Sequence, residues 1–461
     1  MGEVRDQCGI IVAHEFEDVY NGLVSLQHRG QEAAGVAIKH DDGIDIVKWL
    51  GRVRDFKDHY LGHLLRAGER RNGIYMGHVR YSTSGAKRDV RNAHPHFIGG
   101  DITNHDNHMI VRNARIAGVH NGTLVGEEFQ TGDESDTMKM LRLYENIGAD
   151  GIIRRIPAAY SVAIMDADKK EVVALRDRHG MRPLATGERR GRFVVASEDR
   201  AIYAIGGHAE EELRPGSIVY ISSDVNGFRF EDVITDSPQR YCFFERNYLC
   251  HWQTHLGGES VKVIRRKLGN QLAKEFHPDD VDIITYVPTT PYSIVKGYGM
   301  GVGIETTEIF YKMTADRSFI NDSETDRVNS IQGNLYVRDD VDLRDKVVLI
   351  VDDSVVRGNV NEDAAMKCKE RGAKKVYFVS ATPPIGGFVD SVPRGCLYGI
   401  DMPPDDKFIW RESGEDVKMM SEHSKYVDEY YYISKDGMFS SYNEPRENFC
   451  HYCIGGPDPL K

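Results

Sequence analysis

Short apolar segments recur through the first half of the chain, separated by glycine, asparagine and aspartate. This pattern is typical of β-strands joined by turns, and it predicts strands at residues 9–13, 73–77, 160–165, 171–175, 192–196 and 217–222. Helices are expected between them at residues 19–26 and 137–144, the second following polar cap candidates at 133–136. The first half therefore predicts stacked antiparallel sheets interrupted by helices.

The pattern changes after about residue 237. Residues 260–276 and 362–371 are typical of helices, whereas residues 281–287, 346–351 and 375–380 are apolar runs typical of buried strands. Strands that alternate with helices indicate a parallel α/β sheet. We place the boundary near residues 236–238, which predicts one domain over 8–237 and a second over 238–461. A chain of 461 residues has room for both.

Composition and charge narrow the class of protein. Hydrophobic residues make up 40% of the chain and charged residues 28%, as in an ordinary globular protein. The net charge of −12 argues against nucleic acid or an anionic membrane as a partner. No apolar run approaches the roughly 18 residues of a spanning helix, and residues 1–7 are too polar for a signal peptide. We therefore expect a cytoplasmic protein whose seven cysteines are reduced.

Cys8 lies close enough to the start of the chain to become its first residue if residues 1–7 are a propeptide. A free α-amino group, with a pKa of about 7.7–8.0, can act as the base for its own side-chain nucleophile. Taken alone, Cys8 could instead be a small buried residue at the start of a strand.

Five further blocks accompany Cys8, at residues 25–36, 77–85, 120–124, 135–137 and 176–184. With them the chain resembles the glutaminase domain of amidophosphoribosyltransferases, an N-terminal-nucleophile (Ntn) hydrolase with an αββα sandwich. The resemblance spans residues 8 to about 220.

The resemblance implies a role for each of five residues. Cys8 would attack the glutamine carboxamide, and Asn121 and Gly122 would stabilise the oxyanion. Arg80 would hold the α-carboxylate of glutamine, and Asp136 its α-amino group.

Four histidines lie in the loop-like segments 92–97 and 104–108, namely His94, His96, His105 and His108. Their spacing does not follow a metal-binding pattern, so we interpret them as solvated loop residues.

Cysteines outside the glutaminase site include a terminal CxxC motif, Cys450 and Cys453. One amidophosphoribosyltransferase lineage, also made with a propeptide, carries a [4Fe–4S] cluster on cysteines at the places of Cys242, Cys396, Cys450 and Cys453. The resemblance implies that these four are cluster ligands, although four thiolates would suit zinc equally well by number. The two remaining cysteines, Cys250 and Cys368, are expected to be packed.

Residues 346–358 form an apolar strand that ends in two carboxylates and a short Gly loop. They resemble the phosphoribosyl-pyrophosphate motif of type I phosphoribosyltransferases. That likeness implies that Asp352 and Asp353 bind ribose hydroxyls or Mg²⁺. The segment from Ser354 to Gly358, including Arg357, would cradle a 5′-phosphate at the carboxyl end of a strand.

Three segments depart from this motif. The loop continues at 359–363 with Glu362 and Asp363, whose charges would repel a phosphate. The turn at 288–291 ends in Pro291 where the family has glycine, which removes an N–H donor; Thr290 in this turn is a further candidate Mg²⁺ ligand. Residues 317–320 match the start of a lid, whose basic pair is replaced by Gln332 and Asn334.

Together these features predict an enzyme that hydrolyses glutamine at Cys8 and channels ammonia to phosphoribosyl pyrophosphate. The products would be 5-phosphoribosylamine and pyrophosphate, as in the first committed step of purine synthesis. The resemblance also implies a homo-oligomer with small-molecule substrates. Two alternatives remain open: an amidotransferase with a different acceptor, and a catalytically inactive regulatory or sensor protein that retains residues 1–7.

Overall fold

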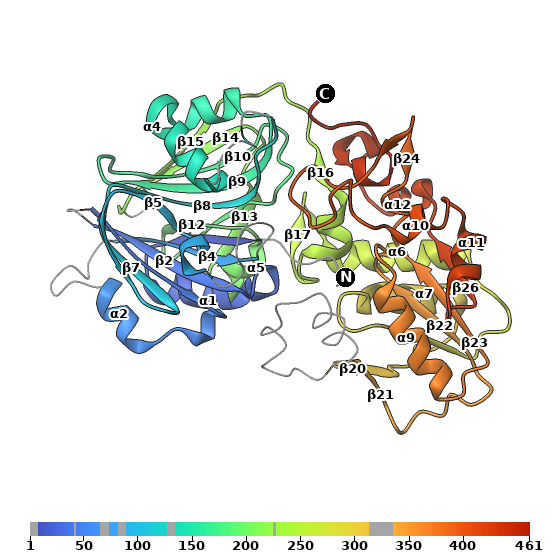
Figure 1. The fold of residues 1–461 in the computed structure, drawn as a ribbon. Coiled ribbons are helices and arrows are strands. Elements are labelled where there is room, and N and C mark those ends of the chain that lie inside the picture. The colour runs from blue at the N-terminus through green and yellow to red at the C-terminus, as the bar shows by residue number, and fades with distance from the viewer. Residues whose placement is uncertain are drawn as a thin grey trace.

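Two sheets of antiparallel strands fill the N-terminal half of the molecule, and a parallel sheet fills the C-terminal half (Figure 1). The structure is a computed structural model that describes residues 8–40, 43–64, 73–81, 89–126, 129, 134–224, 227–312 and 335–461. The change from antiparallel to parallel pairing falls between β15 (Phe228–Asp232) and β19 (Ile283–Tyr286), on either side of the predicted boundary.

The first sheet has nine strands in the order β13-β11-β12-β1-β4-β2-β3-β7-β6. Their bounds are β1 (Gly9–Ala13), β2 (Ala33–His40), β3 (Gly43–Leu50), β4 (Ile74–Arg80), β6 (Asp101–Asn104), β7 (His108–Ala114), β11 (Ala185–Arg189), β12 (Arg192–Ala196) and β13 (His208–Glu212). The second sheet has six, in the order β15-β14-β10-β9-β8-β5. Beside β15 it contains β5 (His96–Ile98), β8 (Ile116–Thr123), β9 (Ala159–Asp166), β10 (Val172–Arg176) and β14 (Ser217–Ile221).

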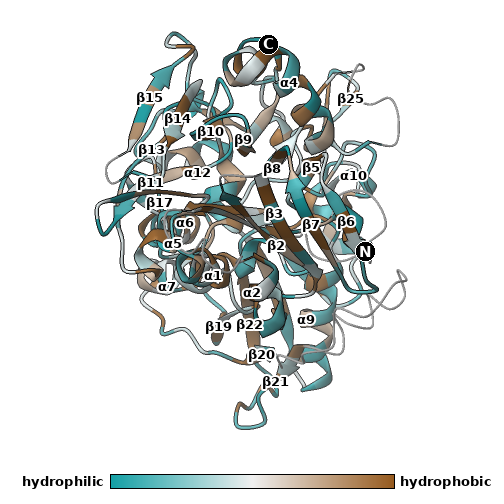
Figure 2. Cartoon of the chain, turned by 90° about the vertical axis from the view of Figure 1, so that its left-hand side faces the viewer, coloured by the Kyte–Doolittle hydropathy of each residue, from teal (hydrophilic) through white to brown (hydrophobic). Residues whose placement is uncertain are grey.

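Alternating side chains on these strands build four layers. Ile10 and Val12 of β1 pack between the two sheets, whereas Ile11 and Ala13 face α1 (Phe16–Ser25) and α5 (Asp199–Ala204). On the far side, α4 (Asp136–Arg155) covers the second sheet. Figure 2 shows the apolar residues concentrated on strands such as β2, β3 and β8. This is the predicted αββα sandwich.

The parallel sheet has the order β19-β22-β23-β26. Its other strands are β22 (Val347–Asp352), β23 (Lys375–Ser380) and β26 (Glu429–Tyr432), and its main helices are α6 (Val261–Glu275), α7 (Tyr292–Val302), α9 (Asn359–Glu370) and α12 (Lys435–Ser440). Leu349 of β22 faces α6 and α7, and Ile350 faces α9, so helices cover both faces. Cys368 on α9 is fully buried there, as predicted.

Short elements complete the described chain. They are η1 (Gln27–Arg29), η2 (Val53–Asp55), α2 (Asp58–Leu64), η3 (Val90–Asn92), β16 (Tyr241–Cys242), the π-helical turn η4 (Glu245–Leu249), β17 (His255–Leu256), β18 (Glu259–Ser260), β20 (Phe310–Lys312), β21 (Leu335–Val337), β24 (Phe388–Val389), β25 (Val392–Pro393), α10 (Ile409–Glu412), α11 (Val417–His423), η6 (Arg446–Asn448), β27 (Phe449–Cys450) and η7 (Tyr452–Ile454). Although distant in sequence, β16 and β27 pair in parallel.

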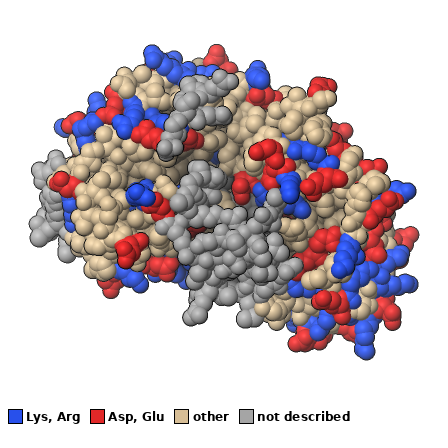
Figure 3. All heavy atoms as spheres, viewed as in Figure 1, with Lys and Arg blue, Asp and Glu red and all other residues tan. Residues whose placement is uncertain are grey.

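The surface agrees with the composition. Basic and acidic side chains are interspersed on the face shown in Figure 3. In the part of the chain that the structure describes, no helix has the length and apolar character needed to cross a bilayer.

The interpretation of His94 and His96 as solvated residues is wrong. Both side chains are buried, because the segment before and within β5 packs beneath the end of β4 rather than projecting from the surface. His105 is exposed and His108 half-buried, closer to the prediction.

Close contact between α6 and α7 depends on glycine. A Cβ atom on Gly297 of α7 would lie 2.1 Å from the carbonyl oxygen of Arg266 on α6. We expect Gly297→Ala to lower the free energy of unfolding by about 1–3 kcal/mol, since the helices must move apart. Urea unfolding followed by circular dichroism checks this. Gly62→Ala is the matched control, because its Cβ would meet nothing within 4 Å; equal or greater stability of the Gly297 variant would contradict the packing argument.

Candidate active sites

Strand pairing places Cys8 beside Arg80. In the antiparallel register of β1 and β4, Gly9 pairs with Val79, so the preceding residue, Cys8, lies opposite Arg80. The Cys8 thiol donates a long hydrogen bond of 3.8 Å to the Tyr81 carbonyl. Arg80 is buried, with its Nη1 4.0 Å from Glu32 Oε2. The predicted nucleophile and the predicted carboxylate-binding residue thus share one end of the sheet.

The Cys8 thiol is held in its neutral form. Burial raises its pKa above the ordinary value, and the charges of Arg80 and Arg29 act in the opposite direction without overcoming it. A neutral thiol needs a base to become a nucleophile. The environment therefore agrees with the need for an adjacent amine.

Asn121 and Gly122 lie on β8 at the same end of the sandwich. His78, two residues before Arg80, donates from Nε2 to the carbonyl of His120 at 3.2 Å, which ties β4 to β8 there. Asn121 is 1% exposed, and its Nδ2 has no hydrogen-bond partner among the described residues. A buried amide donor without a partner suits an oxyanion hole.

Gly122 cannot carry a side chain. Its φ is +146°, and a Cβ atom would lie 2.0 Å from the Ala159 carbonyl oxygen on β9. The close approach of β8 and β9 therefore requires glycine at this position.

Asp136 is the first residue of α4, which begins after the cap residue Ser135 as predicted. Its carboxylate accepts from the Thr123 hydroxyl and from the Leu124 N–H, both at 2.9 Å. These bonds hold the start of α4 against the end of β8, directly beyond Asn121 and Gly122.

Buried histidines pack beside this site, and the sequence did not indicate them. His94 stacks on His78 with ring centroids 4.1 Å apart, and its Nε2 lies 2.7 Å from the Thr137 hydroxyl. His120 approaches the same hydroxyl at 3.4 Å. Thr137 follows Asp136, so the histidines pack against the residues predicted to bind glutamine.

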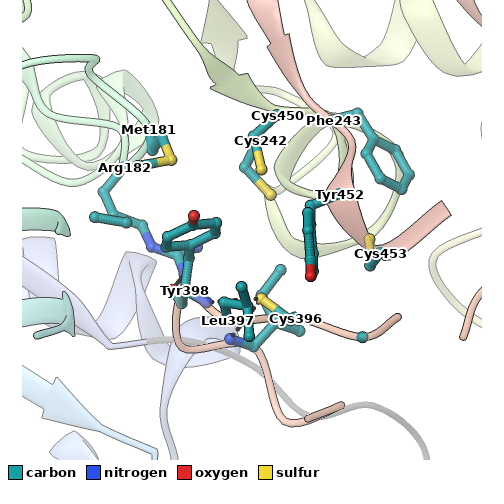
Figure 4. Close-up of a pocket in the computed structure, with 13 residues that line it drawn as sticks. Met181, Arg182, Cys242, Phe243, Cys396, Leu397, Tyr398, Cys450, Tyr452 and Cys453 are labelled. Carbon is teal, nitrogen blue, oxygen red and sulfur yellow. Dashed lines mark hydrogen bonds between the residues drawn. The ribbon is translucent and has the colours of Figure 1, made fainter. Parts of the chain in front are cut away.

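The four predicted cluster cysteines line one cavity. Parallel pairing of β16 and β27 sets Cys242 opposite Cys450, and Cys453 follows on η7. Cys396 comes from the loop before α10, and its sulfur accepts from the N–H groups of Tyr398 and Ile400. Figure 4 shows the side chains spread around the cavity rather than meeting at one point.

The cavity combines four thiols with one buried cation, Arg182. Burial raises the pKa of the Cys242 thiol to about 12, and burial also raises the pKa values of the other three thiols. Arg182 lines the cavity, is 1% exposed, and has an Nε without a partner among the described residues. Within those same residues, no three His, Cys, Asp or Glu side chains are arranged about a single metal ion.

A second cavity lies where β22 ends and α9 begins. It is lined by Tyr248, Asp352, Asp353, Ser354, Val356, Arg357, Gly358, Asn359, Val360 and Asn361. All five residues predicted to bind phosphoribosyl pyrophosphate are among them. The carboxyl end of a parallel strand followed by a helix N-terminus is a common phosphate site.

Local contacts order this loop. The Ser354 hydroxyl donates to Asp353 Oδ1 at 2.9 Å, and Gly358 adopts φ +82° ahead of α9. Arg357 donates to the Asp401 carbonyl at 2.8 Å and pairs with Asp406. Tyr248, which the sequence did not single out, enters from the η4 turn.

Glu362 and Asp363, which are expected to repel a phosphate, do not line the cavity. Glu362 accepts a hydrogen bond from the Ser424 hydroxyl, and Asp363 pairs with Lys367 at 2.5 Å. Asn361 takes the position facing the cavity instead, and its buried Nδ2 has no partner among the described residues.

Other predicted contacts lie elsewhere. Thr290 and Pro291 occupy the turn between β19 and α7 and do not line the cavity. The expected lid, with residues 317–320, Gln332 and Asn334, lies outside the described residues, as do residues 1–7.

The chain is similar to known proteins over nearly its whole length. Residues 101–204 match the family described as a glutamine amidotransferase domain. The chloroplastic amidophosphoribosyltransferase of Vigna aconitifolia is 30% identical over 485 residues, which cover 99% of this chain and 92% of the relative. The amidophosphoribosyltransferase of Methanocaldococcus jannaschii is 29% identical, with 98% of each covered.

Two solved structures share the fold. One is the glutamine phosphoribosylpyrophosphate amidotransferase from B. subtilis complexed with ADP and GMP, with TM-score 0.79, 26% identity and 98% and 97% of the two chains covered. The other is described as the allosteric regulatory enzyme of purine biosynthesis, with TM-score 0.81, 26% identity and 98% and 96% covered. Fold and sites together define a two-domain glutamine amidotransferase. The chain belongs to the amidophosphoribosyltransferase family, and the predicted resemblance is confirmed.

The buried histidines make stability depend on pH. Burial lowers the pKa of His78 to about 3 and of His120 to about 4, and it also lowers the pKa of His94. The unfolded chain, with histidine pKa values near 6.5, binds more protons below that pH. The contribution of these histidines to stability is therefore complete above pH 6.5 and is lost on acidification, by about 2 kcal/mol per such histidine at pH 5.

Urea unfolding at pH 7 and pH 5 checks this. We expect His94→Gln to lose less stability on acidification than the unsubstituted protein. Replacement of the exposed His208 by glutamine should leave the pH dependence unchanged. Equal pH slopes for the His94 variant and the unsubstituted protein would contradict the linkage.

Proposed function

We propose that this protein hydrolyses glutamine at Cys8 and transfers the ammonia to phosphoribosyl pyrophosphate, giving 5-phosphoribosylamine and pyrophosphate for purine biosynthesis. The observation that carries the proposal is the pairing, in one chain of this family, of the Cys8 site with a cavity lined by all five predicted phosphosugar-binding residues. The acidic residues after Gly358, Glu362 and Asp363, do not line the second cavity.

Glutamine hydrolysis follows from the geometry around Cys8. Arg80 and Asp136 recognise the two charged groups of a free amino acid, which excludes a residue within a peptide. Removal of residues 1–7 supplies the α-amine that takes the thiol proton, so that sulfur attacks the carboxamide carbon. The oxyanion that forms accepts hydrogen bonds from Asn121 Nδ2 and the Gly122 N–H. Ammonia leaves, and water then releases glutamate from the thioester.

At the second cavity, the chain's own groups hold the acceptor. The N–H groups at the start of α9 and the amide of Asn361 bind the 5′-phosphate. Asp352 and Asp353 bind the ribose hydroxyls, and with Mg²⁺ bound they also orient the pyrophosphate leaving group. Ammonia then displaces pyrophosphate at the anomeric carbon.

A [4Fe–4S] cluster is the cofactor we propose for the cysteine cavity, with Cys242, Cys396, Cys450 and Cys453 as ligands. A zinc ion would need all four sulfurs within about 2.3 Å of one point. The four side chains instead surround a space, which suits a larger cluster. Bound there, the cluster would cross-link the chain end to β16 as a structural element, with N–H donors to Cys396 and the charge of Arg182 stabilising its negative charge.

Paired variants separate the two half-reactions. We expect Cys8→Ala to lose glutamine-dependent pyrophosphate release by at least about 10³-fold while ammonium-dependent release persists. Asp353→Asn should lower release with both nitrogen donors by about 10²-fold or more and leave glutamine hydrolysis. Pyrophosphate and glutamate are measured on the same Mg²⁺-containing sample.

Cys368→Ala and Asp405→Asn are the matched controls, since the first lies buried on α9 and the second is exposed. Glutamine hydrolysis without pyrophosphate release from either donor would show that the acceptor is a different molecule. A mass spectrum that retains residues 1–7, together with absent hydrolysis, would favour the inactive sensor.

The cluster has its own test. Anaerobically purified protein should be brown and contain iron and acid-labile sulfide, whereas Cys396→Ser should lose both. Cys368→Ser should keep them. A colourless protein with stoichiometric zinc would overturn the cluster assignment.

A further inference from the structure

Two arginines of the N-terminal sandwich are buried where it meets the second domain. The side chains of Arg29 and Arg182 are each 1% exposed. Arg29 pairs with Glu198 at 2.7 Å, and Glu198 belongs to the sandwich and is fully buried. A buried guanidinium is stable only when carboxylates balance its charge and accept its N–H groups.

Glu245 of the second domain supplies the missing carboxylate. It lies at the start of the η4 turn, is buried, and accepts from Arg29 Nη2 and Arg182 Nη1, both at 3.2 Å. Among the described residues that hydrogen-bond to these guanidiniums, Glu198 and Glu245 are the two carboxylates. Without Glu245, the docked domains would therefore bury these two positive charges against one negative charge.

Arg29 also contacts the backbone of the predicted nucleophile, Cys8. Arg29 Nε donates to the Cys8 carbonyl oxygen at 3.1 Å, while its two terminal nitrogens are held by Glu198 and Glu245. A guanidinium is planar and rigid, so fixing its far end fixes the direction of Nε. Glu245 therefore acts on the backbone of Cys8 through one intervening side chain.

We propose that Glu245 is a positioning residue for the glutaminase: the second domain inserts this carboxylate to hold Arg29 against the Cys8 backbone, so that the nucleophile is correctly placed only when the two domains are docked. This inference rests on the proposed role of Cys8. It makes the acceptor domain part of the glutaminase site, which limits hydrolysis to the assembled protein.

Arg182 extends the connection to the cysteine cavity. It donates to Glu245 from Nη1 and to the Tyr398 carbonyl from Nη2, and Tyr398 lines the cavity two residues after Cys396. Cys250 also contacts Glu245, with its sulfur 3.3 Å from Oε2. Through Arg182, the residues of the cysteine cavity thus help to hold the Glu245 carboxylate in place beside Arg29.

Glu245→Gln tests the proposal in the full-length protein. We expect glutamine hydrolysis to fall about 10- to 100-fold in kcat, because small displacements of a nucleophile are costly. The KM for glutamine should change less than about twofold, since Arg80 and Asp136 are untouched. Alkylation of Cys8 by iodoacetamide should become faster, because a less balanced Arg29 charge favours the thiolate. Ammonium-dependent pyrophosphate release should persist.

The pH profile separates positioning from a general loss of structure. Without Glu245, the charge of Arg29 is less balanced, and a nearby cation favours the unprotonated amine and the thiolate. The acid limb of kcat/KM should therefore move to lower pH. Glu444→Gln is the matched control: Glu444 pairs with buried Arg246 in the same domain at 2.6 Å and should leave rate, alkylation and profile unchanged.

The double variant Arg182→Gln with Glu245→Gln keeps the proposal testable if Glu245→Gln alone fails to fold. It removes one buried charge of each sign, so the net buried charge is unchanged. We expect its acid limb to return to the wild-type position while the low kcat remains. The proposal is overturned if Glu245→Gln matches the Glu444 control in kcat, alkylation and acid limb. Absence of glutamine hydrolysis in the wild-type protein would instead defeat the proposed function, with the alkylation rates still reporting on Cys8.

Discussion

The position of Cys8 depends on the burial of β1. This strand lies in the interior of the nine-stranded sheet between β12 and β4, with Ile10 packed between the sheets and Ile11 packed under α1. Because both faces are apolar and buried, a shift in register would move every side chain to the wrong layer. Cys8 directly precedes this strand, so the packing of β1 holds the nucleophile. Arg80 shares that register on β4.

Buried charge links this site to the rest of the chain. The cost of desolvating Arg29 and Arg182 is offset only where carboxylates from both domains meet them. The strands β16 and β27 pair in the same region. Because this pairing sets Cys242 opposite Cys450, it brings together cysteines that are 208 residues apart in the chain. Catalytic geometry and domain docking therefore depend on the same interactions.

The acceptor cavity shows how local sequence can mislead. Glu362 and Asp363 suggest a helix N-terminus hostile to phosphate, yet a helix presents successive residues in different directions. Ser424 and Lys367 take up the two carboxylates, and Asn361 faces the cavity. At this departure from the phosphoribosyltransferase motif, the first turn of α9 therefore presents the uncharged Asn361 to the cavity rather than a carboxylate.

The sequence by itself indicated the change from antiparallel to parallel sheets and several of the elements. The strand at Arg192–Ala196 matches its prediction, and the helix predicted at 260–276 spans Val261–Glu275. These elements bury their own apolar faces, so local periodicity reveals them. Only the tertiary structure decided that His94 is buried and that Glu245 holds Arg29, 216 residues away in the chain. Such polar residues carry no periodic signal, because their burial depends on partners that distant elements bring to them.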